Sequence, residues 1–143
     1  MEYKPTHIIL RKYADVLVRF ALNSGKGIRK DDVVLITANE CAKPLFLELQ
    51  KAVWRAGGHV ISDYHPNNDE FHPEAERNFY THASKHQLEH FPKHQYAGLV
   101  KEIDHQIVIL ADTDMKALGS IDPKLIMRRT MALKPWREMR NIK

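Results

Sequence analysis

The chain has 143 residues, of which 43% are hydrophobic and 28% charged, and its formal net charge at pH 7 is +4. These values are those of an ordinary globular protein and exclude an intrinsically disordered chain, so we expect a single domain over residues 1–143, whose α/β class follows from the predicted elements below. The only cysteine, Cys41, excludes an internal disulfide and a cysteine-cluster zinc site, and it is typical of a reducing compartment such as the cytoplasm.

The amino terminus carries Pro5 and His7 where a signal peptide needs a continuous apolar stretch. No later apolar run approaches the roughly 20 residues that a membrane-spanning helix requires. We therefore expect a cytoplasmic protein that neither is secreted nor enters a membrane.

The first predicted element is an amphipathic helix over residues 6–23. Apolar residues recur along it at intervals of three and four, with charged residues between them. The stripe that should face the core consists of Leu10, Tyr13, Ala14, Leu17, Phe20 and Ala21. Gly25 and Gly27 follow, and glycine tolerates the positive φ at which helices commonly end, so the helix should stop there.

A βαβ unit is predicted next. Residues 32–37 form a short, continuous run rich in β-branched side chains, typical of a central parallel strand covered on both faces. Asn39 is a candidate cap for a helix over about 41–56, which ends at Gly57-Gly58, and residues 59–64 form a second strand. The apolar face of this helix should contain Leu45, Phe46, Leu49, Ala52, Val53 and Trp54.

The second half of the chain is expected to alternate loops and helices around a third strand. Residues 65–74 are rich in turn-forming types and predict an exposed loop. Residues 74–90 are helical in pattern, with a short helix near 96–103 after Pro92, and the continuous apolar run at 106–111 predicts a third buried strand.

The final predicted helix begins at Asp122-Pro123, a capping residue followed by proline at the first helical position. It should break or kink near Pro135, because proline cannot continue the hydrogen bonding of a helix interior. Together the elements predict a three-layer α/β/α protein with a small, mainly parallel sheet of three strands.

Polar residues follow all three predicted strands. Because the carboxyl ends of parallel strands meet at one edge, where ligands usually bind, these residues are candidates for facing a ligand. They are Asn39, Glu40, Asp63, His65, Asp112 and Asp114. The aspartates among them could act as paired carboxylates in acid-base chemistry, but Asp112 and Asp114 have the alternative role of capping the turn that follows.

Histidines recur every four residues from position 82. On an unbroken helix His82, His86 and His90 would stack along one face, within metal-binding distance of one another, before Pro92 breaks the register of His94. This pattern indicates a candidate surface metal site and, at its strongest, a small metalloenzyme. The alternative is a solvated helix face without a metal.

Cys41 has two interpretations: a thiolate activated by a helix amino terminus, or a small buried hydrophobic residue. No glycine-rich phosphate loop follows a strand, so nucleotide binding has only generic α/β support. A basic cluster lies near the carboxyl end and consists of Lys124, Arg128, Arg129, Lys134, Arg137, Arg140 and Lys143. Without a recognisable nucleic-acid module, we interpret this cluster as a solvated or partner-facing surface rather than a nucleic-acid site.

Three stretches resemble the amino-terminal domain of the thermophilic metalloprotease family, which includes aminopeptidase T and aminopeptidase S. The first is LRKYADVLVRFALN at 10–23. The second is DDVVLITA at 31–38, followed by PLFLEL at 44–49 and AGG at 56–58. The third is KALGSIDPKL at 116–125. The resemblance covers nearly the whole chain.

The resemblance implies an enzyme that removes amino acids one at a time from the amino ends of peptides. In that family a larger carboxyl-terminal domain binds two divalent metal ions of the zinc or cobalt type, and no stretch of this chain matches it. We therefore expect no cofactor, catalytic residue or metal ligand here, and no activity of the chain alone. The amino-terminal domain of the family helps to enclose the substrate chamber and contributes to a homodimer, so a docking surface is expected. The chain stops at Lys143 in a basic, partly helical segment, which we interpret as a domain boundary.

A free-standing α/β module of the flavodoxin-like or nucleotide-binding type, using the same strand ends, is the alternative function. Thermal stabilisation by a nucleotide or flavin would favour that alternative over an aminopeptidase domain.

Overall fold

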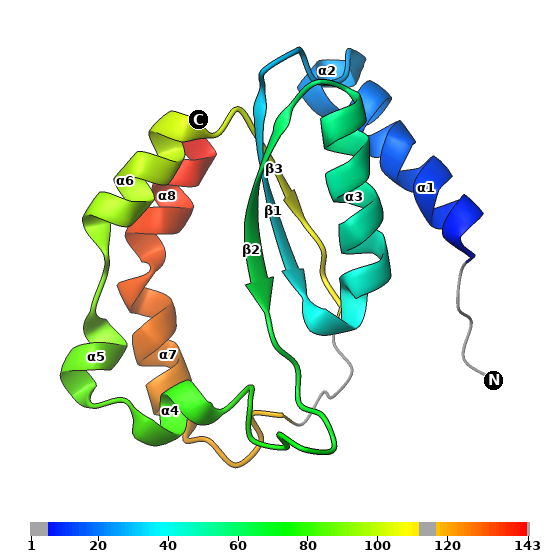
Figure 1. The fold of residues 1–143 in the computed structure, drawn as a ribbon. Coiled ribbons are helices and arrows are strands. Elements are labelled where there is room, and N and C mark those ends of the chain that lie inside the picture. The colour runs from blue at the N-terminus through cyan, green and yellow to red at the C-terminus, as the bar shows by residue number, and fades with distance from the viewer. Residues whose placement is uncertain (1–5, 112–116, 143) are drawn as a thin grey trace. The chain divides into compact units, whose positions relative to one another are not determined.

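The computed structural model describes residues 6–111 and 117–142 (Figure 1). They divide into two compact units. The sheet unit contains residues 6–65 and 103–111, and the helical unit contains residues 66–102 and 117–142. That the two units form a single domain stays a prediction. No helix in the described ranges is long and apolar enough to cross a membrane.

The sheet unit contains three parallel strands: β1 (Val33–Asn39), β2 (His59–His65) and β3 (His105–Val108). Their order is β2-β1-β3, so the first strand is central, as its continuous apolar run predicts. The sheet and the helix that packs against it within the same unit confirm the α/β class (Figure 1).

The outer strands are less buried than the sequence predicts. The third strand was expected at 106–111 as a buried strand, but it begins at His105 and ends at Val108, and Val108 and Leu110 are exposed. The second strand contains only half-buried and exposed residues. The prediction of a strand covered on both faces is therefore correct for β1, where Val34, Leu35 and Ile36 are buried in succession. It is wrong for the two outer strands, which lie at the edges of the sheet that the described residues form.

The first helix is interrupted by a wider turn. It comprises α1 (His7–Val16), a π-helical turn at Leu17–Ala21 and the single turn α2 (Leu22–Gly25). Ala14 and Val18 are fully buried, whereas Tyr13 and Phe20 of the predicted stripe are 54% and 63% exposed. The predicted core face is wrong at Phe20 because the π turn at Leu17–Ala21 adds a residue to the helical period and rotates the face. Tyr13 precedes this turn and lies outside the buried face of α1, on which only Ala14 is buried.

The turn after this helix has the predicted glycine chemistry. Gly25 and Gly27 both have positive φ, and the amide of Gly27 donates to the carbonyl of Leu22 over 2.8 Å. A Cβ at Gly27 would lie 2.0 Å from the carbonyl oxygen of Arg19, so the backbone passes too close for any side chain. Asn23 and Ser24 are also left-handed, which the sequence pattern did not indicate.

The second helix of the sheet unit is α3 (Lys43–Arg55), preceded by a short 3₁₀ turn at Glu40–Ala42 and ended by Gly57, whose φ is 87°. It packs beside α1 and against β1 (Figure 1). The core of the unit consists of Ala14, Val18, Val34, Ile36, Ala38, Phe46, Leu49, Ala52 and Val53. Trp54, predicted on the apolar face, is 55% exposed because it lies on the solvent side of the helix.

The helical unit contains five short helices: α4 (Asn78–His82), α5 (Lys85–Glu89), α6 (Lys93–Glu102), α7 (Pro123–Ala132) and α8 (Lys134–Ile142). The continuous helix predicted over 74–90 is wrong. Ala83 is extended and Ser84 starts a new helix, where its hydroxyl accepts from the Gln87 amide and the Gln87 side chain accepts from the Ser84 amide.

The last two helices agree with the sequence. The carboxylate of Asp122 accepts from the amide of Lys124 over 3.0 Å and caps α7, with Pro123 at its first position. The predicted break falls at Leu133, between α7 and α8. An aromatic stack joins α6 and α8, since Tyr96 lies 5.1 Å from Phe91 and 4.7 Å from Trp136 between ring centroids.

Candidate functional site

The carboxyl edge of the sheet brings together the predicted polar residues of the first two strands. The parallel register places Thr37 beside Asp63 and Asn39 beside His65. The hydroxyl of Thr37 donates to Asp63 Oδ2 over 3.1 Å, and His65 Nε2 lies 2.8 Å from Asp63 Oδ1. Both side chains of the Asp63–His65 pair are about half exposed, so this pair is open to a ligand from solvent.

The segment after the third strand is tied to the same edge. The carbonyl oxygen of Ala111 accepts from the side-chain amide of Asn39 over 2.9 Å and from Cys41 Sγ over 3.2 Å. Asn39 forms no side-chain cap on the following helix, so that part of its predicted role is wrong, and its amide instead holds the chain that leaves β3. Asp112 and Asp114 lie outside the described residues.

Tyr64 is the main residue of the carboxyl edge that the sequence pattern did not indicate. Its ring packs on Phe46 with the centroids 5.0 Å apart. Burial raises the pKa of the Tyr64 hydroxyl, and the charges of Glu40 and Cys41 raise it further, so the phenol stays protonated as a hydrogen-bond donor. The parallel alignment of the two strands could have indicated Tyr64 and Thr37, since both fall within two residues of a predicted site position.

Cys41 lies half-buried at this edge, and as the only cysteine of the chain it forms no internal disulfide. Its Sγ contacts the Ala111 carbonyl, and the 3₁₀ turn that carries it is only three residues long. The carboxyl edge thus offers a carboxylate, an imidazole, a phenol, an amide and a thiol within one sheet unit. Such groups can orient a polar ligand by hydrogen bonding.

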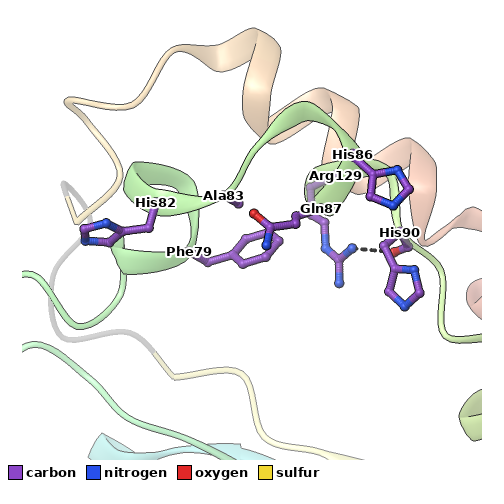
Figure 2. A pocket seen from close by; sticks show the side chains of 7 residues that line it. All are labelled: Phe79, His82, Ala83, His86, Gln87, His90 and Arg129. Atoms are coloured by element: carbon purple, nitrogen blue, oxygen red, sulfur yellow. Dashed lines mark hydrogen bonds between the residues drawn. The ribbon is translucent and has the colours of Figure 1, made fainter.

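The histidines at 82, 86 and 90 line one pocket in the helical unit, but not as the predicted ladder. The pocket has a volume of about 530 Å³ and is lined by Phe79, His82, Ala83, His86, Gln87, His90 and Arg129. Figure 2 shows His82 at one end and His86 and His90 at the other. The expected stacking on one helix face is wrong because Ala83 and Ser84 separate two helices between the first and second histidines.

Arg129 organises this pocket. Its Nη1 donates to the carbonyls of His90 over 2.7 Å and Leu88 over 3.3 Å, and its guanidinium carbon lies 4.9 Å from the centroid of the Phe79 ring (Figure 2). These contacts join α7 to α4 and α5, so the arginine primarily holds the pocket wall together.

The described residues contain no group of three or more histidine, cysteine, aspartate or glutamate side chains that could hold a metal ion. The histidine pocket therefore does not fit a metal centre within this part of the chain, since three converging ligands are the usual minimum. The donors of the carboxyl edge do not fit the two-metal centre that the family resemblance implies.

The fold and the carboxyl edge define an α/β protein with a three-stranded parallel sheet and a polar carboxyl edge. Residues 6–142 match the family of thermophilic metalloproteases (M29), and the chain belongs to that family. This finding confirms the resemblance that the sequence motifs indicated.

The fold is similar to that of wild-type AmpT from Thermus thermophilus, with a TM-score of 0.67 and 23% sequence identity. The alignment covers 91% of this chain and 31% of AmpT, so the chain spans about a third of the length of that structure. At this identity the similarity shows a shared fold. Among curated proteins, none matches the chain.

Proposed function

We propose that this chain forms the amino-terminal domain of a metal-dependent aminopeptidase, an enzyme that removes residues from the amino ends of peptides. The observation that carries the proposal is the match to the thermophilic metalloprotease family over residues 6–142. The fold shared with AmpT over 91% of the chain supports it.

In this proposal the chain is not catalytic by itself. The two divalent metal ions, of the zinc or cobalt type, are held by a carboxyl-terminal domain outside residues 1–143. The support is that the chain corresponds to 31% of the AmpT structure, so most of that protein has no counterpart here.

The role that we propose for the domain is to help enclose the substrate chamber and to contribute to a homodimer of the complete, cytoplasmic enzyme. The carboxyl edge is the best candidate for the chamber-facing surface, because Asp63 and His65 are half exposed there and carry hydrogen-bonding groups that a peptide backbone can meet. No nucleic acid or membrane takes part in this function.

The test is hydrolysis of an amino-acid anilide by the purified chain, with and without cobalt or zinc. AmpT serves as the positive control, and any longer product of the same reading frame is assayed beside it. We expect turnover only where a metal-binding domain is present. Metal-dependent turnover by the 143-residue chain alone would contradict the proposal.

A further inference from the structure

Another pocket lies in the sheet unit, and its lining residues come from the amino-terminal part of α1 and from α3. Figure 1 shows these two helices side by side. Its volume is about 240 Å³, which is enough for a small metabolite. Its lining residues are His7, Ile8, Arg11, Glu48, Lys51 and Arg55. Five of these six residues carry ionisable groups, which is unusual for a gap between two packed helices.

Glu48 is the unusual member of this set because it is only 4% exposed. Its Oε1 accepts from Lys51 Nζ over 2.7 Å, whereas its Oε2 is buried and has no hydrogen-bond partner among the described residues. The hydrogen bond from Lys51 lowers the pKa of Glu48, so the carboxylate is ionised. A buried, ionised oxygen without a donor is costly, and it favours a ligand that supplies one.

The cations around Glu48 are not equally engaged. Lys51 is paired with Glu48, and Arg55 Nη2 lies 3.2 Å from Asp15 Oδ1. Arg11 has no ion pair among the described residues. Among the described residues, the pocket therefore combines a buried carboxylate oxygen without a donor and a guanidinium without an ion pair.

We infer that this pocket binds a small zwitterion, specifically a free aliphatic α-amino acid. The ammonium group donates to Glu48 Oε2, the carboxylate pairs with Arg11, and the side chain lies against Ile8. The inference requires the Glu48 carboxylate to rotate so that Oε2 faces the pocket, which the broad last torsion of glutamate allows.

Ligands with a single charge fit less well. A simple cation is repelled by Arg11, Lys51 and Arg55, and a simple anion leaves Glu48 Oε2 unpartnered and is repelled by it. A zwitterion satisfies both ends at once. An amino acid is also the product of the activity proposed above, so a role in sensing product rests on that proposal, whereas the binding itself does not.

The experiment is calorimetric titration of the 143-residue chain with L-leucine, beside two ligands that each lack one charge. N-acetyl-leucine has no ammonium group and leucinamide has no carboxylate. We expect leucine to bind and each analogue to bind at least about tenfold more weakly. Equal binding of leucine and either analogue, binding of inorganic phosphate in preference to leucine, or no binding of leucine would overturn the inference.

Variants locate the site. Glu48→Gln and Arg11→Gln should each weaken leucine binding by about tenfold or more. Arg11→Gln should leave the folding of the chain intact, because it changes only a surface charge. Glu102→Gln, an exposed change in the helical unit, is the matched control and should leave binding unchanged. Unaltered binding in Arg11→Gln would place the ligand elsewhere. None of these results bears on the anilide assay, so the two proposals fail independently.

Discussion

The sheet unit and the helical unit are each stabilised from within, by different kinds of contact. The sheet unit has a contiguous apolar core, in which nine buried side chains from α1, the π turn, β1 and α3 pack together. The buried residues of the helical unit are few, and its helices are joined by the Arg129 hydrogen bonds and the Tyr96 aromatic stack. The sheet unit should therefore depend on side-chain volume, and the helical unit on a few directed contacts.

Matched leucine truncations test this contrast most strongly. Leu49 in α3 and Leu88 in α5 are both almost fully buried, but only Leu49 belongs to the large core cluster. We expect Leu49→Ala to lower the free energy of unfolding by about 3 to 4 kcal/mol and Leu88→Ala by about 2 kcal/mol, because a dense core collapses less around a cavity. Urea denaturation followed by circular dichroism measures both.

Leu47→Ala is the control for these truncations, since Leu47 lies on the same helix as Leu49 and is 43% exposed. Its loss should stay below about 1 kcal/mol. If Leu88→Ala proves more destabilising than Leu49→Ala, the proposed difference between the two units is wrong.

Glycine-to-alanine substitutions give opposite signs in the two units. Gly27→Ala forces a Cβ against the Arg19 carbonyl at a positive φ, so we expect a loss of about 2 kcal/mol or more. Gly98, in the interior of α6, has open space where a Cβ would lie, and Gly98→Ala should stabilise by about 1 kcal/mol. Thermal melts of the two variants decide the signs, and a neutral Gly27→Ala would show that the turn relaxes freely.

The strength of local sequence signals accounts for how far the sequence predicted the fold of both units. The central strand at residues 33–39 was predicted because a short, continuous run of β-branched residues is typical of a covered strand, and α7 because Asp122-Pro123 is a specific start signal. The split of the 74–90 helix was missed although Ser84 and Gln87 form a capping box in the sequence itself. The π turn that buries Val18 has no comparable local signal.

For the candidate site, the sequence predicted which residues meet at the carboxyl edge but not which partners they contact. Asn39, Asp63 and His65 follow strands, so their convergence needs only a parallel sheet. Their partners could not be assigned in advance, because Thr37 reaches Asp63 through the register of the two strands and Asn39 reaches Ala111 through the path of the chain after β3. Helical periodicity predicted that His82, His86 and His90 stack on one helix face. This stacking is wrong because the helix is broken at Ala83 and Ser84.

Neighbouring arginines in α7 offer a smaller test within the helical unit. Arg129→Gln removes two hydrogen bonds to carbonyls and the contact with Phe79, so we expect a loss of about 1 to 2 kcal/mol and faster amide exchange in α4 and α5. Arg128→Gln removes only a half-exposed ion pair with Glu89, 3.7 Å apart, and should cost less than about 0.5 kcal/mol. Equal effects of the two substitutions would rule out the structural role assigned to Arg129.

The smallest expected effect is a pH dependence in the sheet unit. Asp32 Oδ2 accepts from the amide of Arg29 over 2.8 Å and lies 2.9 Å from His105 Nε2. The backbone hydrogen bond from Arg29, followed by the contact with His105, holds the pKa of Asp32 below its usual value of 3.8. Because the folded pKa is the lower one, the stabilisation is present above the unfolded value and is lost as the pH falls through the folded pKa.

Asp32→Asn should therefore be less stable than the wild type at pH 6, and this difference should shrink as the pH is lowered below 3.8. Melting temperatures between pH 6 and pH 2 measure it. Asp31→Asn, an exposed neighbour with positive φ that asparagine tolerates, controls for the loss of one negative charge. Parallel curves for wild type and Asp32→Asn across this range would mean that the contacts of the Asp32 carboxylate with Arg29 and His105 do not stabilise the folded state.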